Sequence, residues 1–194
     1  MKLIAASAFA VAALAASSAL AQTQPPANPG PVIPGICAYS SQQLLATSSA
    51  GQAVRTRMQA LETEVQGELN PYQTAIQTEL QALQTSGASL PEAERNSRGQ
   101  ALQQRINEEQ QLRGTRANEL RYTLSEQLKK IEAAAGPIAT AVYQERGCGV
   151  LLDADNINYI NPAMDITSTV IQRLNQQLST LSFNRMPVPA QAQQ

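Results

Sequence analysis

A single narrow line of apolar side chains runs through residues 54–83 at helical spacing. Its members are three or four residues apart, and eight steps cover 29 positions, or 3.63 residues per turn. A strict heptad repeat has 3.5 residues per turn and winds helices into a left-handed supercoil, so this helix should stay nearly straight. One apolar residue per turn suits contact with one partner helix rather than burial in a broad core. We predict a helix from Gln42 to Thr85, with this line as its seam: Val54, Met58, Leu61, Val65, Leu69, Tyr72, Ile76, Leu80 and Leu83.

The sequence after this line stops one helix and starts another within a few residues. Thr85-Ser86-Gly87 ends on a glycine suited to the left-handed position after a helix C-terminus. Ser89-Leu90-Pro91-Glu92 then has the form of a capping box with proline in the first turn. The second helix is predicted from about Leu90 to Arg146, with Gly147 as its C-terminal glycine. We therefore predict an antiparallel helical hairpin over residues 44–146.

The second helix carries its own apolar line, but that line is interrupted. Residues 107–111, between Ile106 and Ala117, are all polar. At about 1.5 Å per residue the first arm would reach roughly 60 Å, which a domain of this size cannot enclose. The arms should therefore project, with weak contact partway along. The predicted seam residues of the second arm are Leu102, Ile106, Ala117, Leu120, Leu124, Leu128, Ile131, Ala135, Ile138 and Val142.

Two prolines lie inside the helical segments. Pro71 follows Asn70, which favours a helix restart with Asn70 as the N-cap and Pro71 at the first helical position. Pro137 should bend the second arm near its base, because an interior proline removes a hydrogen bond and clashes with the preceding turn.

The first 21 residues have the form of a secretory signal peptide. Lys2 gives a positive start, residues 3–16 are apolar and alanine-rich, and Ala19-Leu20-Ala21 is a cleavage pattern. The apolar run is short for a membrane span and no stop-transfer charges follow it, so we expect no transmembrane segment after cleavage. We assign residues 1–21 to the signal peptide and 22–35 to a proline-rich leader. The mature protein should then lie outside the cytoplasm.

Short strands and a last helix flank the hairpin. Ile36–Tyr39 is a strand candidate, Cys148–Asp153 reads as a buried strand, and Asn156–Ile160 as its hairpin partner or an edge strand. Asp165 should cap a last helix that has Ile166, Val170, Leu174 and Leu178 on one face. The fold class is α+β, a small β-rich body with a long helical hairpin. Residues 36–43 and 147–182 form the body with its C-terminal helix, and residues 183–194 a disordered tail.

The composition argues against an enzyme, a metal protein and a nucleic-acid binder. The chain has no histidine and two cysteines, so the usual catalytic bases and zinc ligands are mostly missing. Without Lys2 it has 13 basic and 15 acidic residues, whereas nucleic-acid binders carry clustered positive charge. Asp153, Asp155 and Asn156 resemble the start of a calcium loop, but the glycine and the closing glutamate are missing. We predict no catalytic residue, cofactor or metal.

The order strand, long helical hairpin, strand, turn, strand, helix resembles the Skp/OmpH family of periplasmic chaperones. The specific part of the resemblance is residues 149–156 (GVLLDADN), Tyr159 and Met164-Asp165-Ile166-Thr167. The resemblance implies a homotrimer with a small β-barrel body and three hairpins hanging as tentacles around a cavity. It also implies an ATP-independent periplasmic holdase, which binds unfolded outer-membrane proteins and prevents their aggregation during outer-membrane assembly. The alternatives are a structural coiled-coil spacer or adaptor of the cell envelope and, more remotely, a hydrolase or ligand-binding enzyme.

The charge of this chain departs from the family. Familiar members are strongly basic, whereas this chain is slightly acidic after removal of Lys2. A local run of cations on the second arm is diluted by Glu119 and Glu126, which is typical of a solvated helix face. We therefore carry over no lipopolysaccharide site from the family, and we do not expect electrostatic capture of clients to follow from the resemblance.

Four residues are candidate site residues. Two cysteines in an exported chain are expected to pair, so Cys37 and Cys148 are candidates for an intrachain disulfide if their strands lie side by side in parallel. Two free buried thiols, or bridges between protomers, are the alternatives. Tyr72 and Tyr122 are possible client contacts, and their alternative role is packing in the seam.

Overall fold

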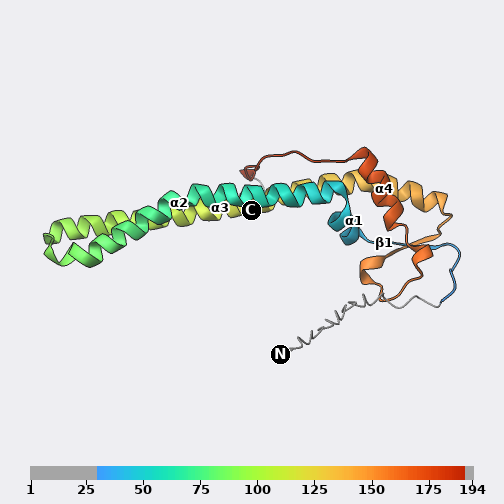
Figure 1. The fold of residues 1–194 in the computed structure, drawn as a ribbon, viewed down its shortest axis with the longest axis horizontal. Coiled ribbons are helices and arrows are strands. Elements are labelled where there is room, and N and C mark those ends of the chain that lie inside the picture. Colours follow the sequence, from blue (N-terminus) through green and yellow to red (C-terminus); the bar gives the residue numbers. More distant parts are fainter. Residues whose placement is uncertain (1–29, 191–194) are drawn as a thin grey trace, which may run out of the picture.

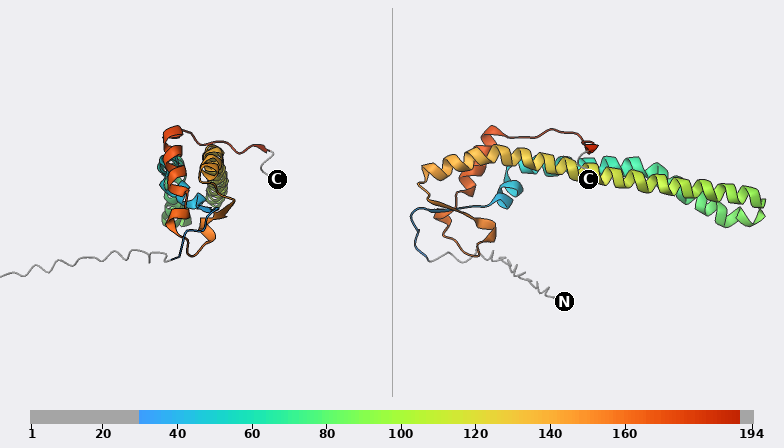
Figure 2. Two further views of the ribbon diagram at one scale, coloured as in Figure 1. Left: turned by 90° about the vertical axis from the view of Figure 1, so that its right-hand side faces the viewer. Right: turned by 180° about the vertical axis from the view of Figure 1, so that it is seen from behind.

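The computed structural model describes residues 30–190, which form a small body and a long two-helix hairpin projecting from it (Figures 1 and 2). The predicted signal peptide, residues 22–29 of the leader and residues 191–194 of the tail lie outside the described residues. The elements are β1 (Ile36–Tyr39), α1 (Ser41–Thr47), α2 (Ser49–Ser86), η1 (Gly87–Ser89), α3 (Glu92–Glu145), β2 (Val150–Asp153), η2 (Ala154–Asn156), η3 (Pro162–Met164) and α4 (Thr167–Gln177).

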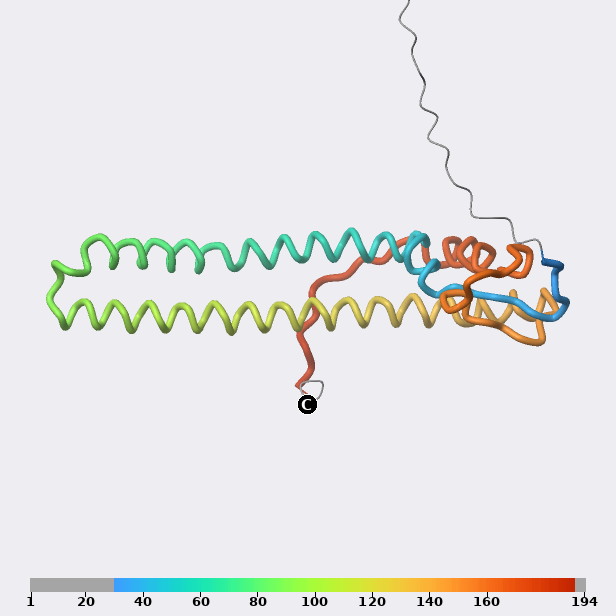
Figure 3. Tube along the Cα trace, turned by 90° about the horizontal axis from the view of Figure 1, so that it is seen from below, coloured from blue at the N-terminus to red at the C-terminus, as the bar shows by residue number. Residues whose placement is uncertain are grey.

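The two arms of the hairpin are α2 and α3, which lie side by side along their length (Figure 3). Both helices continue through their prolines, Pro71 in α2 and Pro137 in α3. The predicted restart after Asn70 is therefore wrong. Instead of capping a new helix, the Asn70 side-chain oxygen accepts a hydrogen bond from Gln66 Nε2 at 2.9 Å. Between residues 30 and 190, no helix is both long and apolar enough to span a bilayer.

The tip of the hairpin is closed by a short 3₁₀ turn, η1. Gly87 is right-handed (φ −60°), and its amide donates to Leu83 O, so the predicted left-handed glycine is wrong. The predicted capping box is also wrong, because Ser89 Oγ donates to Ser86 O at 2.7 Å and Pro91 is the N-cap of α3. Hydrogen bonds between residues three positions apart, such as the one from Leu90 N to Gly87 O at 3.3 Å, close the tip instead of the predicted glycine and capping box.

The predicted first helix is broken at Ser48, which separates α1 from α2. Ser48 has extended backbone angles (φ −67°, ψ 151°), and its side chain accepts a hydrogen bond from the Gly51 amide at 3.1 Å. A Cβ at Gly51 would overlap with the Leu45 carbonyl. The glycine therefore lets α2 start against the backbone of α1, and the chain turns before the long arm begins.

The base of α3 ends as the sequence predicts. Gly147 is left-handed (φ 64°) and follows Arg146, the C-cap. The Cys148 amide donates to Tyr143 O at 3.1 Å and the Gly147 amide to Gln144 O at 3.0 Å, which is the Schellman pattern. This turn sends the chain directly from the arm into the body.

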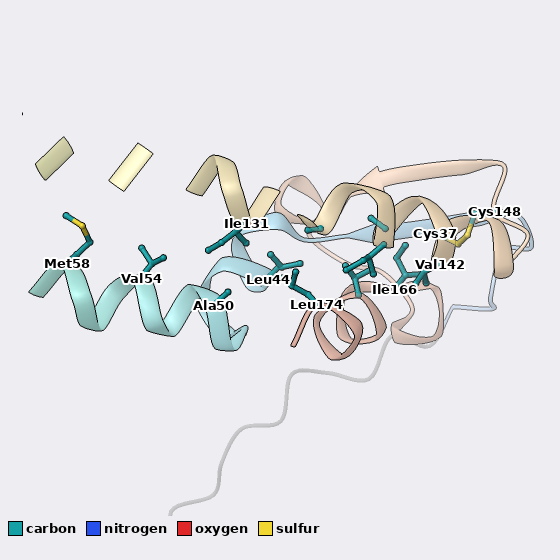
Figure 4. Close-up of a cluster of buried hydrophobic side chains, with 14 of the residues drawn as sticks. Cys37, Leu44, Ala50, Val54, Met58, Ile131, Val142, Cys148, Ile166 and Leu174 are labelled. Atoms are coloured by element: carbon teal, nitrogen blue, oxygen red, sulfur yellow. A yellow bond between two sulfur atoms is a disulfide. The ribbon is translucent and has the colours of Figure 1, made fainter. Parts of the chain in front are cut away.

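The two strands of the body pair in parallel, with Ile36 opposite Val150 and Tyr39 opposite Asp153. Cys37 and Cys148 are joined by a disulfide in the structure, with their Cα atoms 5.8 Å apart (Figure 4). The bond closes a separation of 111 residues and so links the two ends of the hairpin segment.

Two features of the predicted sheet are wrong. All four residues of β2 are exposed, although the sequence predicts a buried strand. Residues 156–160 form no strand, because Asn156 ends the 3₁₀ turn η2 and residues 157–160 follow it as a loop. Within the described residues the sheet thus has two strands, extended by a single bridge from Ala38 to Asp165.

Asp155, which follows β2, fixes the start of α1, which follows the parallel strand β1. Its carboxylate accepts hydrogen bonds from Ser40 Oγ, from the Gln42 amide at 3.1 Å and from Ser41 Oγ at 3.3 Å. The Ser40 hydroxyl and the Gln42 amide hold the pKa of Asp155 below its ordinary value. Asp153 in turn accepts from the Asp155 amide at 3.0 Å and from Asn156 Nδ2 at 2.7 Å, so both carboxylates serve turns.

The buried core lies where α1, α4 and the base of the arms meet (Figure 4). Of the predicted face of α4, Ile166, Val170 and Leu174 are buried and Leu178 is half-buried. The predicted cap is wrong by one residue, because Ile166 is the N-cap and Asp165 accepts from the Thr167 amide at 2.8 Å. The side chains of Thr167 and Asn175 accept hydrogen bonds from the backbone amides of Ser40 and Ser49, both at 2.8 Å. The other members of the core are Cys37, Leu44, Ala50, Val54, Met58, Leu61, Ile131, Ala135, Ile138, Ala139, Val142 and Cys148.

Burial along the first arm falls from base to tip. The seam residues from Val54 to Leu69 are all buried, and Leu61 is 1% exposed. Beyond them Tyr72, Ile76 and Leu83 are half-buried, and Leu80 is 41% exposed. The hairpin is therefore held together at its base, and its outer part has little apolar contact.

Leu61 and Leu80 allow this gradient to be measured. We expect Leu61→Ala to lower the free energy of unfolding by about 2–5 kcal/mol, because it leaves a cavity in a closed core. Leu80→Ala should cost less than about 1 kcal/mol, since its side chain is already in water for much of its surface. Urea unfolding at one protein concentration compares the two, and equal losses would contradict the gradient.

The disulfide gives a second prediction. The double variant Cys37→Ser/Cys148→Ser should be less stable by up to about 4–5 kcal/mol, the chain-entropy estimate for a loop of this size. Thermal unfolding of the oxidised protein, the reduced protein and the double variant is the measurement. Thiol labelling of the exported, unreduced chain should find no free cysteine, and labelling of both would refute the pairing.

Candidate functional site

The first candidate surface is an exposed apolar patch on the body, which we call the body patch. Tyr159 is the most exposed member at 77%, and β2 contributes three consecutive apolar side chains. A shallow apolar hollow beside it is lined by Ile36, Ile157, Ile160 and Met164. Among the described residues β2 pairs only with β1, so its outer edge meets no strand. The body patch consists of Val32, Ile33, Val150, Leu151, Leu152 and Tyr159.

A body with this patch is incomplete as an isolated unit. A two-stranded sheet is marginal on its own, and an open strand edge with apolar side chains favours pairing with another chain. Ile33, Leu152 and Tyr159 line one hollow, Leu151 lies on the opposite face of the strand, and exposed apolar surface of this kind marks an interaction site. The patch therefore points to association through the body, away from the arms.

The second candidate surface lies halfway along the hairpin, where an ionic cluster links both arms and the tail. Arg116 of α3 donates to Glu68 of α2 at 2.6 Å and to Glu119 at 3.0 Å. Arg185, from the tail, reaches the same two carboxylates at 2.7 and 3.0 Å. Hydrogen bonding from Arg185, then from Arg116, holds the pKa of Glu68 below its ordinary value. All four groups are part-buried, which makes this a network rather than a set of isolated surface pairs.

The tail that supplies Arg185 follows a defined path, although the sequence predicts disorder from residue 183. Residues 183–190 run back along the hairpin and cross from the first arm towards the second (Figures 1 and 3). The Met186 amide donates to Thr123 Oγ1 at 2.8 Å, and Arg57 Nε donates to the Phe183 carbonyl at 3.0 Å. Phe183, Arg185-Met186 and Val188 could have signalled this segment, but the proline and glutamine content of residues 183–194 favours disorder.

The tail explains a difference between the predicted and observed seams of α3. The sequence places Leu124 and Leu128 in the seam, but Leu124 is 37% exposed and Leu128 half-buried. Thr123 and Gln127 are fully buried instead. The hydrophobicity pattern predicts that the two leucines face inward. In the structure the tail covers Thr123 and Gln127 instead, so the buried face of α3 is rotated by one residue relative to the prediction. The two leucines border a shallow groove at the base of the arms with Leu45, Val54 and Met58.

The outer part of the hairpin is joined mainly by polar contacts. Arg98 of α3 donates to both carboxylate oxygens of Glu79 on α2, at 2.7 and 3.0 Å. A shallow hollow beside this pair is lined by Ala75, Ala101 and Leu102. Near the predicted polar interruption, Glu109 is 7% exposed and pairs with Arg113 on its own helix. Small, polar and weakly packed surfaces of this kind offer scattered contacts to another chain.

Tyr72 and Tyr122 lie on opposite sides of the ionic cluster. Tyr72 is half-buried one turn beyond Glu68, towards the tip. Tyr122 is half-buried near Glu119 on the side of the base, in a hollow that Pro187 and Val188 of the tail also line. The structure does not bring the two rings together. Contact with a client thus stays a prediction for each tyrosine separately.

The described residues offer no arrangement for metal chemistry. Between residues 30 and 190, no group of three or more His, Cys, Asp or Glu side chains is placed to hold a metal ion. The carboxylates with shifted pKa are hydrogen-bonded to arginines, as Glu79 and Glu145 are, or serve turns, as Asp155 does. Hydrogen bonds within the fold therefore account for the lowered pKa of these carboxylates.

Three comparisons with known proteins were made. A family model described as outer membrane protein (OmpH-like) matches residues 35–174. A solved structure described as an outer membrane chaperone (OmpH-like) from Caulobacter crescentus CB15 is 31% identical, with a TM-score of 0.75, and the match covers 84% of this chain and 95% of that one. A comparison with curated proteins gave no match.

The ionic cluster gives a pH-dependent prediction. Because the pKa of Glu68 is lower in the folded protein than the unfolded value of about 4.3, its contribution to stability is full above that value and is lost as the pH falls through the folded pKa. We expect Glu68→Gln to be about 1 kcal/mol less stable than the wild type at pH 7, and this difference should shrink below about pH 4. Exposed Glu62 provides the control, Glu62→Gln. Thermal unfolding from pH 3 to 7 is the measurement, and a Glu68→Gln deficit that is constant over this range would contradict the assignment.

Proposed function

Because this chain belongs to the OmpH-like outer membrane protein family, we propose that it is a periplasmic holdase that binds unfolded outer-membrane proteins and prevents their aggregation without ATP. The observation that carries the proposal is the projecting hairpin, with its buried base and thinly packed outer arms. A chain held on such arms meets many small contacts, and none of them forms a rigid pocket.

The outer arms have the surface that this activity needs. Half-buried Tyr72 and Ile76 and partly exposed Leu80 provide scattered apolar contacts among polar side chains. Promiscuous binders use adaptable surfaces that repack around different partners. Weak, distributed binding also lets the client leave without an energy source. Tyr72 and Tyr122 are the residues we propose for client contact.

We further propose that three copies associate through the body patch to form a small β-barrel from which the hairpins hang. The support is the exposed apolar surface of β2 and Tyr159 and the open edge of the sheet. Association would cover apolar side chains that a single small body leaves in water. Three hairpins would then surround a cavity large enough for an unfolded chain.

Export to the periplasm is supported by two independent features. The N-terminal sequence has the pattern of a cleavable signal peptide, and the structure pairs Cys37 with Cys148, as suits an oxidising compartment. We assign no catalytic role to this protein, since the family is one of chaperones.

Suppression of client aggregation tests the proposal. An outer-membrane protein diluted from urea should stay soluble at one trimer per client, as measured by light scattering without ATP. Leu151→Asp places a charge in the body patch and should give monomers by size exclusion with light scattering, together with loss of the holding activity. Asn158→Asp, on an exposed loop of the same body, is the matched control.

Two outcomes would contradict the proposal. If the wild type is a monomer, there is no cavity between three hairpins. If a client precipitates in the presence of a folded trimer, the protein has no holdase activity. A spacer or adaptor of the envelope would give the second result and would instead capture one folded partner.

A further inference from the structure

The tail is an extended peptide bound along the hairpin of its own chain. Residues 183–190 leave the body after α4 and run along the arms without forming a regular helix or a sheet with them (Figures 1 and 3). The tail therefore displays how an extended chain is recognised by these arms. We call the residues that bind it the tail strip: Arg57, Glu68, Glu119, Thr123 and Gln127.

Part of this recognition is directed at the peptide backbone. Arg57 Nε donates to the Phe183 carbonyl at 3.0 Å, and Thr123 Oγ1 accepts from the Met186 amide at 2.8 Å. Any extended segment offers these two groups, one carbonyl and one amide a few residues further on. Arg57 is itself held by Glu64 at 2.8 Å, so its guanidinium is positioned from the arm.

The other part of the recognition selects a cation followed by an apolar side chain. The Arg185 guanidinium lies between the carboxylates of Glu68 and Glu119, and its side chain is 19% exposed. The next residue, Met186, places its sulfur 3.8 Å from Gln127 Nε2. An acidic residue in place of Arg185 would face two carboxylates.

The burial of polar residues in the tail strip indicates that another chain segment normally covers it. Thr123 and Gln127 are polar and 0% exposed, on a helix whose leucines at the neighbouring positions remain in contact with water. Without a covering chain, this polar pair would face solvent between the arms. Arg185 Nη1, a buried donor of the tail, has no hydrogen-bond partner in the part of the chain that the structure describes, so the strip does not satisfy the tail completely.

We propose that the tail strip is a peptide-binding site for extended segments that carry an arginine or lysine followed by an apolar residue, and that residues 183–190 are its resident occupant. On the basis of the proposed function, we further infer that a client segment of this chemistry displaces the tail. The tethered tail competes at an effective concentration of about 1 mM, so it keeps weak external peptides out. The strip thus sets a lower limit on the affinity of segments that bind there.

Binding of the tail sequence in trans tests the site in the full chain. In Arg185→Glu the new carboxylate faces Glu68 and Glu119, so the tail should leave the strip. A fluorescein-labelled peptide of residues 181–190 should then bind this variant at least tenfold more tightly than it binds the wild type, measured by anisotropy. The same peptide with glutamate in place of arginine should bind neither protein.

Control variants separate this result from a general effect of charge. Arg173→Glu breaks an exposed ion pair with Glu145 on the body, makes the same charge change and should leave peptide binding as in the wild type. Arg185→Ala, which removes the contact without adding a repelled charge, should also increase peptide binding. If both Arg185 variants keep wild-type helicity and neither binds the peptide more tightly, or if the glutamate peptide binds equally well, the site is refuted.

Displacement by a client distinguishes this inference from the proposed function. An unfolded outer-membrane protein that the wild type keeps soluble should release the labelled peptide from Arg185→Glu and should speed amide exchange of residues 183–190 in the wild type. A client that is held while the peptide stays bound and exchange is unchanged would refute displacement and leave the holdase intact. Peptide binding without any client holding would instead contradict the holdase and support the strip.

Discussion

The length over which apolar side chains are buried between the two arms determines the rest of this structure. From Val54 to Leu69 the first arm has a buried residue at nearly every turn, and the first three of them, Val54, Met58 and Leu61, join the core formed with Ile131 and α4. Beyond Leu69 the seam residues of the first arm are half-buried or exposed, and the arms meet through fewer buried groups, such as Leu102 and the bidentate pair of Glu79 with Arg98. Because less apolar surface is buried there, the outer arms should open and bend more easily than the base. The most stable packing thereby lies at the base of the hairpin, and the most weakly packed surface lies towards its tip.

The body fixes the position of the arms, and part of its own apolar surface stays exposed. The Schellman turn at Gly147, the parallel pairing of β1 with β2 and the disulfide bring both ends of the hairpin to one place. The same short sheet leaves β2 exposed and its outer edge open. A rigid attachment point combined with exposed apolar surface suits assembly through the body, with the arms free to meet a client. This division of roles is what the proposed trimer would use.

Sequence periodicity predicted the hairpin, the buried part of the first seam and the face of α4 because these depend on helical spacing alone. The family resemblance, carried by residues 149–156 and 164–167, is confirmed by the family match and by the structure from Caulobacter crescentus. The errors lie where tertiary contacts decide. Ser48 breaks the first helix because Gly51 allows α2 to start against α1, and a run such as Thr47-Ser48-Ser49 could have signalled this cap. Thr123 and Gln127 face inward because a segment sixty residues away covers them, which no local pattern encodes.

Amide hydrogen exchange along α2 reports the opening of each part of the first arm in the intact protein. We expect slow exchange for the amides of residues 54–69 and much faster exchange for those of residues 72–83, within the same helix. Equally slow exchange from base to tip would mean that the arms are tightly packed throughout. A hairpin of that kind would have no open surface with which to hold another chain.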